Sequence, residues 1–335
     1  MTKTSLSLDT SPAIYVEHLR KEYGSKVAVQ DLSLQVERGE VFGFLGPNGA
    51  GKTTTIKMLN GLVRPTSGRL SVLGRPLGDR EAKKRIGFLP ELFRFHEWMR
   101  AEEFLDFHGS LYGLSRGERK QRIPEALKLV GLEGRSRSRL RTFSKGMLQR
   151  IGIAQAVLAD PLLVFLDEPT SALDPLGRRD VRDIIRTLQE RGVTVFLNSH
   201  LLGEVEAVCD RVAIIKDGEV AALGPKAGLL GGEHVVEVWV TDMPERLLHE
   251  VRRRYRVVGA EARGQGQARG PAPTGGRAPV AVNTECRLSL HLSNGEAPAL
   301  VELLVGGGAR VHEVTPRQRS LEDLFVDVVQ VGGDR

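Results

Sequence analysis

Two kinds of hydrophobic pattern alternate along the first 230 residues of the chain. Continuous apolar runs occur in EVFGFLG (40–46), PLLVFLDEP (161–169) and VTVFLNSH (193–200), and amphipathic stretches such as DVRDIIRTLQERG (180–192) lie between them or follow them. A continuous apolar run is typical of a strand buried on both faces of a parallel sheet, and an amphipathic stretch predicts a helix. Strands that alternate with helices predict an α/β core.

Other segments of this part complete the α/β pattern. Short strand-like stretches broken by turns occupy about residues 13–40, and KTTTIKMLNGL (52–62) predicts a helix directly after the first apolar run. The pattern from about residue 90 to 160 is mostly helical, which predicts a helical subdomain. We therefore assign residues 1–230 to one α/β domain.

The pattern changes within GLLGGE (228–233), where a second domain begins. Residues 231–335 predict a small C-terminal accessory domain of the α+β class, because strand-like and helical segments both occur in it. Its predicted elements are the strands HVVEVWV (234–240) and CRLSLHLS (286–293) and the helices APALVELLV (297–305) and SLEDLFVDVVQ (320–330).

A segment of biased composition interrupts this accessory domain. GQGQARGPAPTGGRAP (264–279) is rich in Gly, Ala, Pro and Arg. Such a composition cannot bury enough apolar surface to offset the entropy lost on ordering. We predict a disordered insertion over about residues 259–281.

Composition and charge narrow the class of protein. Of 335 residues, 41% are apolar and 27% charged, as in an ordinary globular protein, and the net charge is +6. Seven Arg and only one acid, Glu261, lie between Arg252 and Arg277, so the excess charge is local and we expect no nucleic-acid partner. The two cysteines, Cys209 and Cys286, form no metal or disulfide framework and fit a reducing cytosol.

Hydropathy indicates how this chain would reach a membrane. No apolar stretch approaches the roughly 20 residues that a transmembrane helix needs. The N-terminal sequence MTKTSLSLDTSP also lacks the apolar core of a secretion signal. We therefore expect a cytoplasmic protein, which another chain would have to hold at any membrane.

The segment GPNGAGKTT (46–54) carries the strongest chemical signal. It matches the pattern G-x-x-x-x-G-K-[ST], follows a predicted strand and opens a predicted helix, which is the context that a phosphate-binding P-loop requires. Backbone N–H groups and the positive helix end bind phosphate, Lys52 reaches the β- and γ-phosphates, and the Thr53 hydroxyl binds Mg²⁺. The predicted ATP-binding residues here are Gly46, Pro47, Asn48, Gly49, Ala50, Gly51, Lys52, Thr53 and Thr54.

Two carboxylates end the apolar run LLVFLDEP. Asp167 is positioned to hold Mg²⁺ through water, because Mg²⁺ sheds its water ligands reluctantly. Glu168 would point elsewhere and take a proton from an attacking water. A pair of solvated acids that cap the next helix is the alternative, and the apolar strand and the P-loop upstream favour the catalytic interpretation.

A second potential phosphate site lies in FSKGMLQR (143–150). Ser144 is a good N-cap for the helix that follows, and Gly146 would let a ligand approach the backbone. From these residues alone, an ordinary capped helix is the favoured interpretation.

The order and spacing of these motifs decide between the two interpretations. The P-loop, the S-x-G helix start, LLVFLDEPTSALD and NSH together resemble the nucleotide-binding subunit of an ABC transporter over about residues 13–225. The resemblance implies a P-loop NTPase fold of ABC type, in which N-terminal antiparallel strands and a helical subdomain flank a mixed sheet. It also implies a head-to-tail dimer, in which Ser144 and Gly146 of one subunit close over the ATP held by the other.

The resemblance implies roles for four more residues. Tyr23 resembles the aromatic residue that stacks on adenine, although an aromatic in a strand is also often a core residue. Glu91 stands where many members have a Gln that binds Mg²⁺ and couples to the membrane partner. Asp174 resembles the loop that crosses the dimer interface, and His200 resembles the His that contacts the γ-phosphate and supports catalysis.

Two departures from the commonest family sequence suggest a branch. Phe143 to Met147 replace the usual L-S-G-G-Q, and Glu91 replaces Gln. Both variants, with the closing phrase SLEDLFV (320–326), resemble the ATPases of bacterial ABC-2-type exporters. We expect an ATP-hydrolysing motor subunit that pairs with a second ATP-binding subunit, and we expect a homodimer rather than a heterodimer. We also expect it to act with a separate multi-span permease at the inner face of the cell membrane.

The surface for such a permease is predicted after Glu91. Phe93, Phe95 and Trp98 lie in ELFRFHEWM, which lacks a helical period and offers aromatic anchors for a partner. A core of the helical subdomain is the alternative role of these rings.

The main alternative function is that of a soluble ABC-type ATPase that acts in translation or DNA maintenance. The DNA-maintenance members carry a long coiled coil between the P-loop and the catalytic acids, and no sustained heptads separate Lys52 from Asp167 here. The translation members usually carry two such domains in one chain. A P-loop kinase or GTPase would lack the S-x-G helix start.

Overall fold

The computed structural model describes residues 11–171, 173–230, 234–263, 285–292, 295–317 and 320–330. These residues form two compact units. The first contains the described residues up to Leu229 and those from Phe325, and the second runs from Leu230 to Leu324. The end of the terminal helix therefore belongs to the first unit, whereas the sequence assigned it to the accessory domain.

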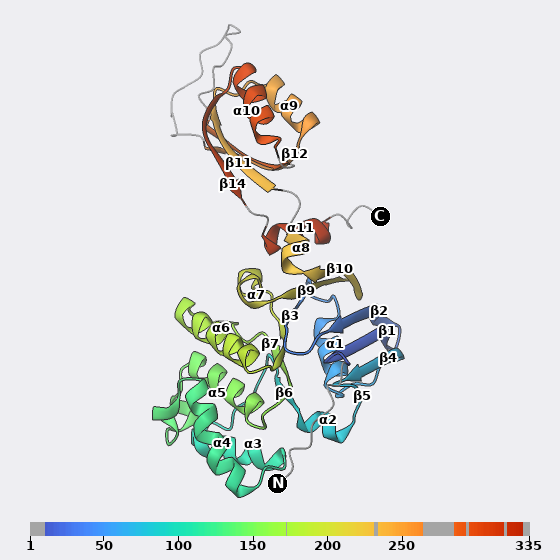
Figure 1. Ribbon diagram of the computed structural model, residues 1–335, viewed down its shortest axis with the longest axis vertical. Coiled ribbons are helices and arrows are strands. Elements are labelled where there is room, and N and C mark those ends of the chain that lie inside the picture. Colours follow the sequence, from blue (N-terminus) through green and yellow to red (C-terminus); the bar gives the residue numbers. More distant parts are fainter. Residues whose placement is uncertain are drawn as a thin grey trace. The chain divides into compact units, whose positions relative to one another are not determined.

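A ten-stranded mixed sheet organises the first unit, in the order β5-β4-β1-β2-β10-β9-β3-β8-β7-β6 (Figure 1). The strands β9, β3, β8, β7 and β6 run parallel, whereas β1 pairs antiparallel with both β2 and β4. The strands are β1 (Ile14–Tyr23), β2 (Lys26–Val36), β3 (Val41–Leu45), β4 (Ser67–Val72), β5 (Arg75–Pro76), β6 (Ile86–Leu89), β7 (Leu163–Asp167), β8 (Thr194–Asn198), β9 (Arg211–Lys216) and β10 (Glu219–Pro225).

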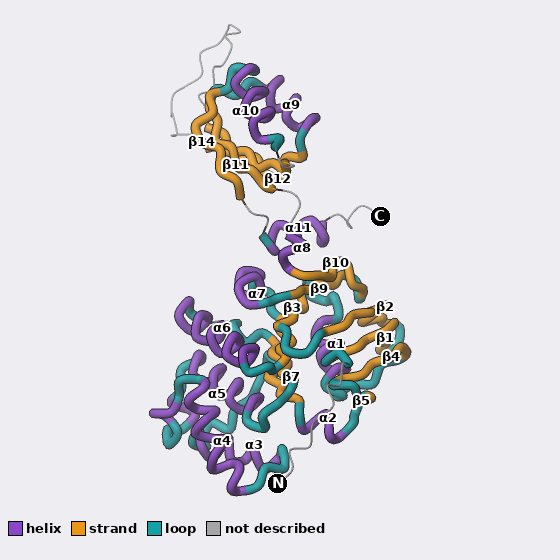
Figure 2. The backbone as a smooth tube through the Cα atoms, in the orientation of Figure 1, coloured by secondary structure: helices purple, strands orange, loops and turns teal. Residues whose placement is uncertain are grey.

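The helices of the first unit alternate with these strands, as the sequence predicts for an α/β core (Figure 2). The helical subdomain is present as α3, α4 and α5 and two short 3-10 turns. The helices are α1 (Lys52–Leu59), α2 (Arg80–Lys84), α3 (Ala101–Leu111), α4 (Arg116–Leu129), α5 (Lys145–Val157), α6 (Pro175–Glu190), α7 (Leu202–Val208) and α8 (Lys226–Leu230).

The three apolar runs form the buried centre of the sheet. Every residue of β3, β7 and β8 is buried. The rings of Phe44 and Phe165 lie with their centroids 5.1 and 5.3 Å from that of Phe196 on β8. Because each of these strands ends at the same edge of the sheet, the residues that follow them are brought together there.

The second unit is a four-stranded antiparallel sheet in the order β12-β13-β11-β14. The chain order β-α-β-β-α-β and this strand order are those of a split βαβ, or ferredoxin-like, arrangement. Val238, Leu288 and Leu290 of the sheet form one buried core with Val251 and Leu304 of the helices. The elements are β11 (His234–Thr241), α9 (Glu245–Arg254), β12 (Arg256–Arg263), β13 (Glu285–Leu292), α10 (Ala297–Gly306) and β14 (Arg310–Arg317), and α11 (Leu321–Gln330) follows them.

The predicted insertion begins too early. Residues 259–263 belong to β12, where Gly259 pairs with Ser289 and Arg263 with Glu285. Pairing with β13 supplies backbone hydrogen bonds to a stretch whose own apolar pattern is weak, so the strand could not be read from composition. The rest of the predicted insertion, residues 264–281, lies outside the described residues.

Across the described residues, none of the helices combines the length and the apolar character that a membrane span requires.

Candidate active site

The loop between β3 and α1 has the backbone conformation of a phosphate cradle. Gly49 and Gly51 have φ angles of 87° and 96°, in the left-handed region that favours glycine. A Cβ atom on Gly51 would lie 2.5 Å from the carbonyl oxygen of Ala28, so no other residue fits there without a shift of the backbone. The loop therefore has the shape that the sequence predicts for GPNGAGKTT.

Lys52 begins α1 and turns back over this loop. Its Nζ donates to the carbonyl oxygens of Gly46 at 2.6 Å and Pro47 at 3.0 Å. Burial lowers the pKa of Lys52, and the nearby carboxylates of Glu168 and Asp167 oppose that shift. The ammonium group is thus held where phosphates would contact the loop.

Asp167 is the last residue of β7 and is buried. Its Oδ1 accepts a hydrogen bond from Nδ2 of Asn198 at 2.6 Å, because β7 and β8 pair in register with Asp167 opposite Asn198. Burial raises the pKa of the Asp167 carboxyl, and the Asn198 hydrogen bond partly opposes this. The sequence prediction omitted Asn198, although its place at the end of the neighbouring apolar strand was a usable signal.

Glu168 adopts a left-handed backbone conformation with φ 53°, which is uncommon outside glycine. Its buried carboxylate accepts a hydrogen bond at Oε1 from the backbone N–H of His200 at 3.0 Å, and the ring Nδ1 of His200 lies 2.7 Å from Oε2. Burial raises the pKa of Glu168, and His200 opposes the shift. The two neighbouring acids therefore have different partners, as the sequence predicts for two different roles.

These groups surround one pocket of about 500 Å³. It brings together most of the predicted P-loop residues with Glu91, Glu168 and His200, whereas Asp167 is buried and is not a lining residue. Lys26 also lines the pocket and was not predicted. The lining residues are Lys26, Ala28, Asn48, Gly49, Gly51, Lys52, Thr53, Thr54, Glu91, Glu168, Asn198 and His200.

Tyr23 is not among the residues that line this pocket, although its strand partner Lys26 is. It pairs with Lys26 at the β1–β2 hairpin and is 48% exposed, with Nζ of Lys21 4.8 Å from the ring centroid. The ring is therefore not a core residue, which was the alternative for this position. It is accessible to a flat ring bound next to Lys26.

Ser144, Gly146 and Asp174 do not reach the pocket. Ser144 caps α5, since its Oγ accepts from the backbone N–H of Met147 at 3.3 Å. Asp174 caps α6 in the same way, and its Oδ1 accepts from the N–H of Gly177 at 2.7 Å. Within this chain their contacts are those of helix caps.

The donor set of the pocket suits a hard cation. Thr53 and Glu91 offer oxygen atoms beside buried Asp167, and Oδ1 of Asn198 is buried without a hydrogen-bond partner among the described residues. Mg²⁺ prefers a few protein oxygens together with phosphate oxygens and water. In the described part of the chain no cluster of three or more His, Cys, Asp or Glu could hold a metal on its own, so phosphate and water would supply the other ligands.

Comparison with known proteins identifies the family. Residues 29–171 match the family model described as ABC transporter. The chain is also 41% identical to the linearmycin resistance ATP-binding protein LnrL of Bacillus subtilis, over 71% of this chain and 78% of the relative. This chain belongs to the family of ABC transporter ATP-binding proteins. Such subunits are ATPases that power transport, together with a separate membrane permease component, and their domain binds nucleotide.

Two other relatives and one solved structure match this ABC protein over different shares of its length. The ABC transporter ATP-binding protein YhcH of Bacillus subtilis, described as uncharacterized, is 34% identical over 93% of this chain and 94% of the relative. The similarly described sll0415 of Synechocystis sp. is 51% identical, but the match covers 63% of this chain and 60% of that protein. A solved ATP-binding subunit of an ABC transporter superposes with a TM-score of 0.60 at 34% identity, over 65% of this chain and 91% of that one.

Proposed function

We propose that this ABC protein is the motor subunit of an exporter, in which ATP hydrolysis at the pocket beside Lys52 drives a separate permease. The observation that carries the proposal is the convergence of Lys52, Glu168 and His200 on one pocket of about 500 Å³. A cation for phosphate, a carboxylate with a raised pKa and a residue that orients it are the groups that hydrolysis needs.

Each residue has a distinct part in the proposed reaction. The loop amides and Lys52 hold the phosphates, and bound Mg²⁺ would neutralise phosphate charge next to Thr53, Asp167 and Glu91. Glu168 takes a proton from the attacking water. His200 fixes the Glu168 carboxylate through its backbone N–H and its ring, and Asn198 fixes Asp167.

We propose that a second copy of the chain completes the site. Ser144 and Asp174 are exposed at helix starts and lie outside the pocket of their own chain. A helix N-terminus binds anions, so Ser144 and Gly146 suit the phosphates of an ATP held by a partner. A head-to-tail homodimer uses both surfaces, and its closure would depend on bound ATP.

The proposed permease surface lies directly after Glu91 in the chain. It keeps Trp98 of the sequence prediction but has Leu92 in place of Phe93 and Phe95. Phe93 and Phe95 are half-buried and pack against Phe104, with ring centroids 6.0 and 5.8 Å away. Leu92 and Trp98 are 86% and 71% exposed. Leu92 and Trp98 would provide the apolar anchors for a permease at the inner face of the membrane.

The export direction rests on likeness to LnrL, whose name refers to linearmycin resistance. The alternative function in translation or DNA maintenance is not favoured, because the relatives described above are transporter subunits. The transported compound would be selected by the permease, which is another chain.

A pull-down tests this function. Tagged Glu168→Gln protein would be recovered from detergent-solubilised cells with ATP and Mg²⁺, and its partners identified by mass spectrometry. We expect a multi-span membrane protein, and we expect its recovery to fall with the additional change Trp98→Ala but not with Arg179→Gln, an exposed position on α6. Recovery of ribosomal or DNA-bound proteins alone would contradict the transport role.

A further inference from the structure

Four arginines alternate with other residues in RSRSRLR (135–141), an arginine segment that lies between α4 and α5. Each of these arginines is exposed, and each residue between two of them is half-buried or buried. Leu140 is 0% exposed and so fixes the segment to the helical subdomain. The alternation therefore places every guanidinium group of the segment at the surface.

The arginine segment pairs with the stretch of chain that leads into α3. The backbone N–H of Arg141 donates to the carbonyl oxygen of Glu97 at 3.0 Å, and that of Glu102 donates to the carbonyl oxygen of Ser136 at 2.9 Å. Trp98, which is 71% exposed, lies within the paired stretch. The arginines are thus held next to one of the two residues of the proposed permease surface.

Two arginines stand directly opposite each other in this pairing. Arg100 and Arg139 form an antiparallel bridge, and the adjacent hydrogen bonds join the residues on either side of them. This kind of pair brings opposite side chains closest, and like charges there are destabilising. Glu103 lies 3.9 Å from Arg100, whereas Arg137, Arg139 and Arg141 form no side-chain ion pair or hydrogen bond among the described residues.

The two paired stretches carry an excess of positive charge. Residues 97–102 and 136–141 together contain four arginines and two glutamates. When the flanking residues are included, 94–103 and 133–141 contain six arginines and four glutamates, so the excess stays at two positive charges. An external anion would offset this excess and the repulsion between the opposed guanidinium groups.

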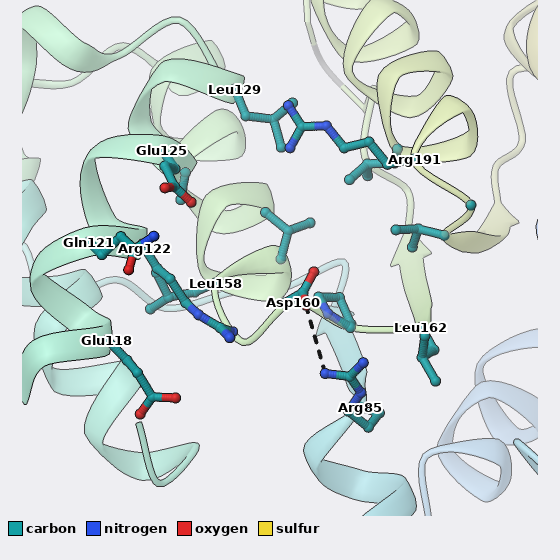
Figure 3. A pocket seen from close by; sticks show the side chains of 16 residues that line it. Arg85, Glu118, Gln121, Arg122, Glu125, Leu129, Leu158, Asp160, Leu162 and Arg191 are labelled. Atoms are coloured by element: carbon teal, nitrogen blue, oxygen red, sulfur yellow. Dashed lines mark ion pairs between the residues drawn. The ribbon is translucent and has the colours of Figure 1, made fainter. Parts of the chain in front are cut away.

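A cavity of about 580 Å³ beside α4 shows the contrasting case, in which charges balance (Figure 3). Three arginines and three carboxylates line it, and one such pair lies 3.8 Å apart (Figure 3). These residues are Arg85, Arg122, Arg191, Glu118, Glu125 and Asp160. The cavity therefore has no excess charge to attract an ion, whereas the arginine segment does.

We propose that Arg100, Arg137, Arg139 and Arg141 form an arginine surface that binds the phosphate groups of anionic phospholipids next to the permease. The planar guanidinium group binds phosphate through paired hydrogen bonds. Basic side chains beside an exposed tryptophan are also typical of surfaces that lie against anionic membranes. The position beside a membrane rests on the exporter role proposed above, whereas the contact with lipid can be measured without a permease.

The test is sedimentation of the full chain with vesicles of phosphatidylcholine and phosphatidylglycerol, without permease or nucleotide. Two variants each replace three exposed arginines: Arg137→Gln/Arg139→Gln/Arg141→Gln in the arginine surface, and Arg64→Gln/Arg69→Gln/Arg75→Gln as a control of equal charge. We expect the first to bind at least about tenfold more weakly than the control, since each arginine near an anionic surface adds to the affinity. Equal binding by the two variants, or wild-type binding no stronger than to pure phosphatidylcholine, would overturn the proposal.

Fluorescence of Trp98 locates the contact on the molecule. The chain has two tryptophans, so Trp239→Phe leaves Trp98 as the single reporter. We expect a spin label on the lipid headgroup to quench Trp98, and we expect the change in the arginine surface to abolish this quenching. Vesicle binding without quenching of Trp98 would place the contact elsewhere on the chain and overturn the proposal.

The pull-down with Glu168→Gln separates a lipid from a protein partner. Lower recovery of the permease with the arginine variant, together with no vesicle binding by the wild type, would assign the arginines to an acidic segment of the permease and overturn the lipid contact. Arginine-dependent vesicle binding with no membrane protein in the pull-down would instead support the lipid contact and contradict the exporter role.

Discussion

The imidazole Nδ1 of His200 lies 2.7 Å from Oε2 of Glu168, while the backbone N–H of His200 donates to Oε1 of the same carboxylate at 3.0 Å. Residue 200 thus holds both oxygens of the proposed general base. These contacts favour the charged form of the carboxylate and so oppose the desolvation by burial, which raises the pKa of Glu168. The relationship leads directly to a prediction for the pH dependence of hydrolysis.

The change His200→Ala should move the acid limb of hydrolysis to higher pH. A general base must be deprotonated, so activity is lost as pH falls through the pKa of Glu168. Burial raises that pKa and His200 lowers it, so removing the ring raises it further. Phosphate release measured across pH checks this, with His249→Ala on α9 as the control; an acid limb that stays in place or moves to lower pH would contradict it.

The change Asp167→Asn should stabilise the ligand-free protein while weakening its function. Burial makes the charged Asp167 carboxylate costly, as the raised pKa indicates, and an amide of the same shape removes the charge but can still accept from Asn198. We expect the free energy of unfolding to rise by about 1 kcal/mol near neutral pH.

Binding of ATP with Mg²⁺ should fall in the same variant. Denaturant unfolding without nucleotide and nucleotide titration with Mg²⁺ check the two effects. A variant of lower stability would show that the charge of Asp167 is compensated within the fold.

The terminal helix α11 should depend on a single lysine of β9. Nζ of Lys216 donates to the carbonyl oxygens of Val329 at 2.7 Å and Val328 at 3.4 Å, in the last turn of the helix. A cation at that end satisfies free carbonyls and complements the helix dipole. Lys216→Met should therefore cost about 1–2 kcal/mol of local stability.

Hydrogen exchange of the α11 amides measures this loss. Lys128→Met, an exposed position on α4, is the matched control. Equal protection of α11 in the Lys216 variant and the wild type would show that the helix is held by its apolar contacts alone.

Sequence patterns predicted the elements of the first unit well. The buried strands β3, β7 and β8 need apolar residues on both faces, and the left-handed backbone conformation at positions 49 and 51 favours glycine. Both features can be recognised in the amino-acid sequence. Strand β12 was missed at residues 259–263, because its stability comes from pairing with β13 rather than from its own composition. Local pattern predicts local structure, and non-local pairing is decided by the whole fold.

The sequence predicted most residues of the candidate site but not the contacts between them. The adjacent acids Asp167 and Glu168 were separated into two roles, and the structure gives them separate partners. The sequence could not supply the register that places Asn198 opposite Asp167, nor the burial that alters their pKa values. The roles of Ser144 and Asp174 stay predictions, because a partner subunit would have to supply their contacts.

The most direct measurement is the rate of phosphate release by Glu168→Gln beside the wild type. Loss of a general base should slow hydrolysis by about 10²–10⁴-fold, while ATP binding is retained because Lys52 and the loop are unchanged. Glu190→Gln, an exposed position at the end of α6, should hydrolyse ATP at the wild-type rate. Hydrolysis by Glu168→Gln at the rate of Glu190→Gln would contradict the assignment of Glu168 and the chemistry built on its contact with His200.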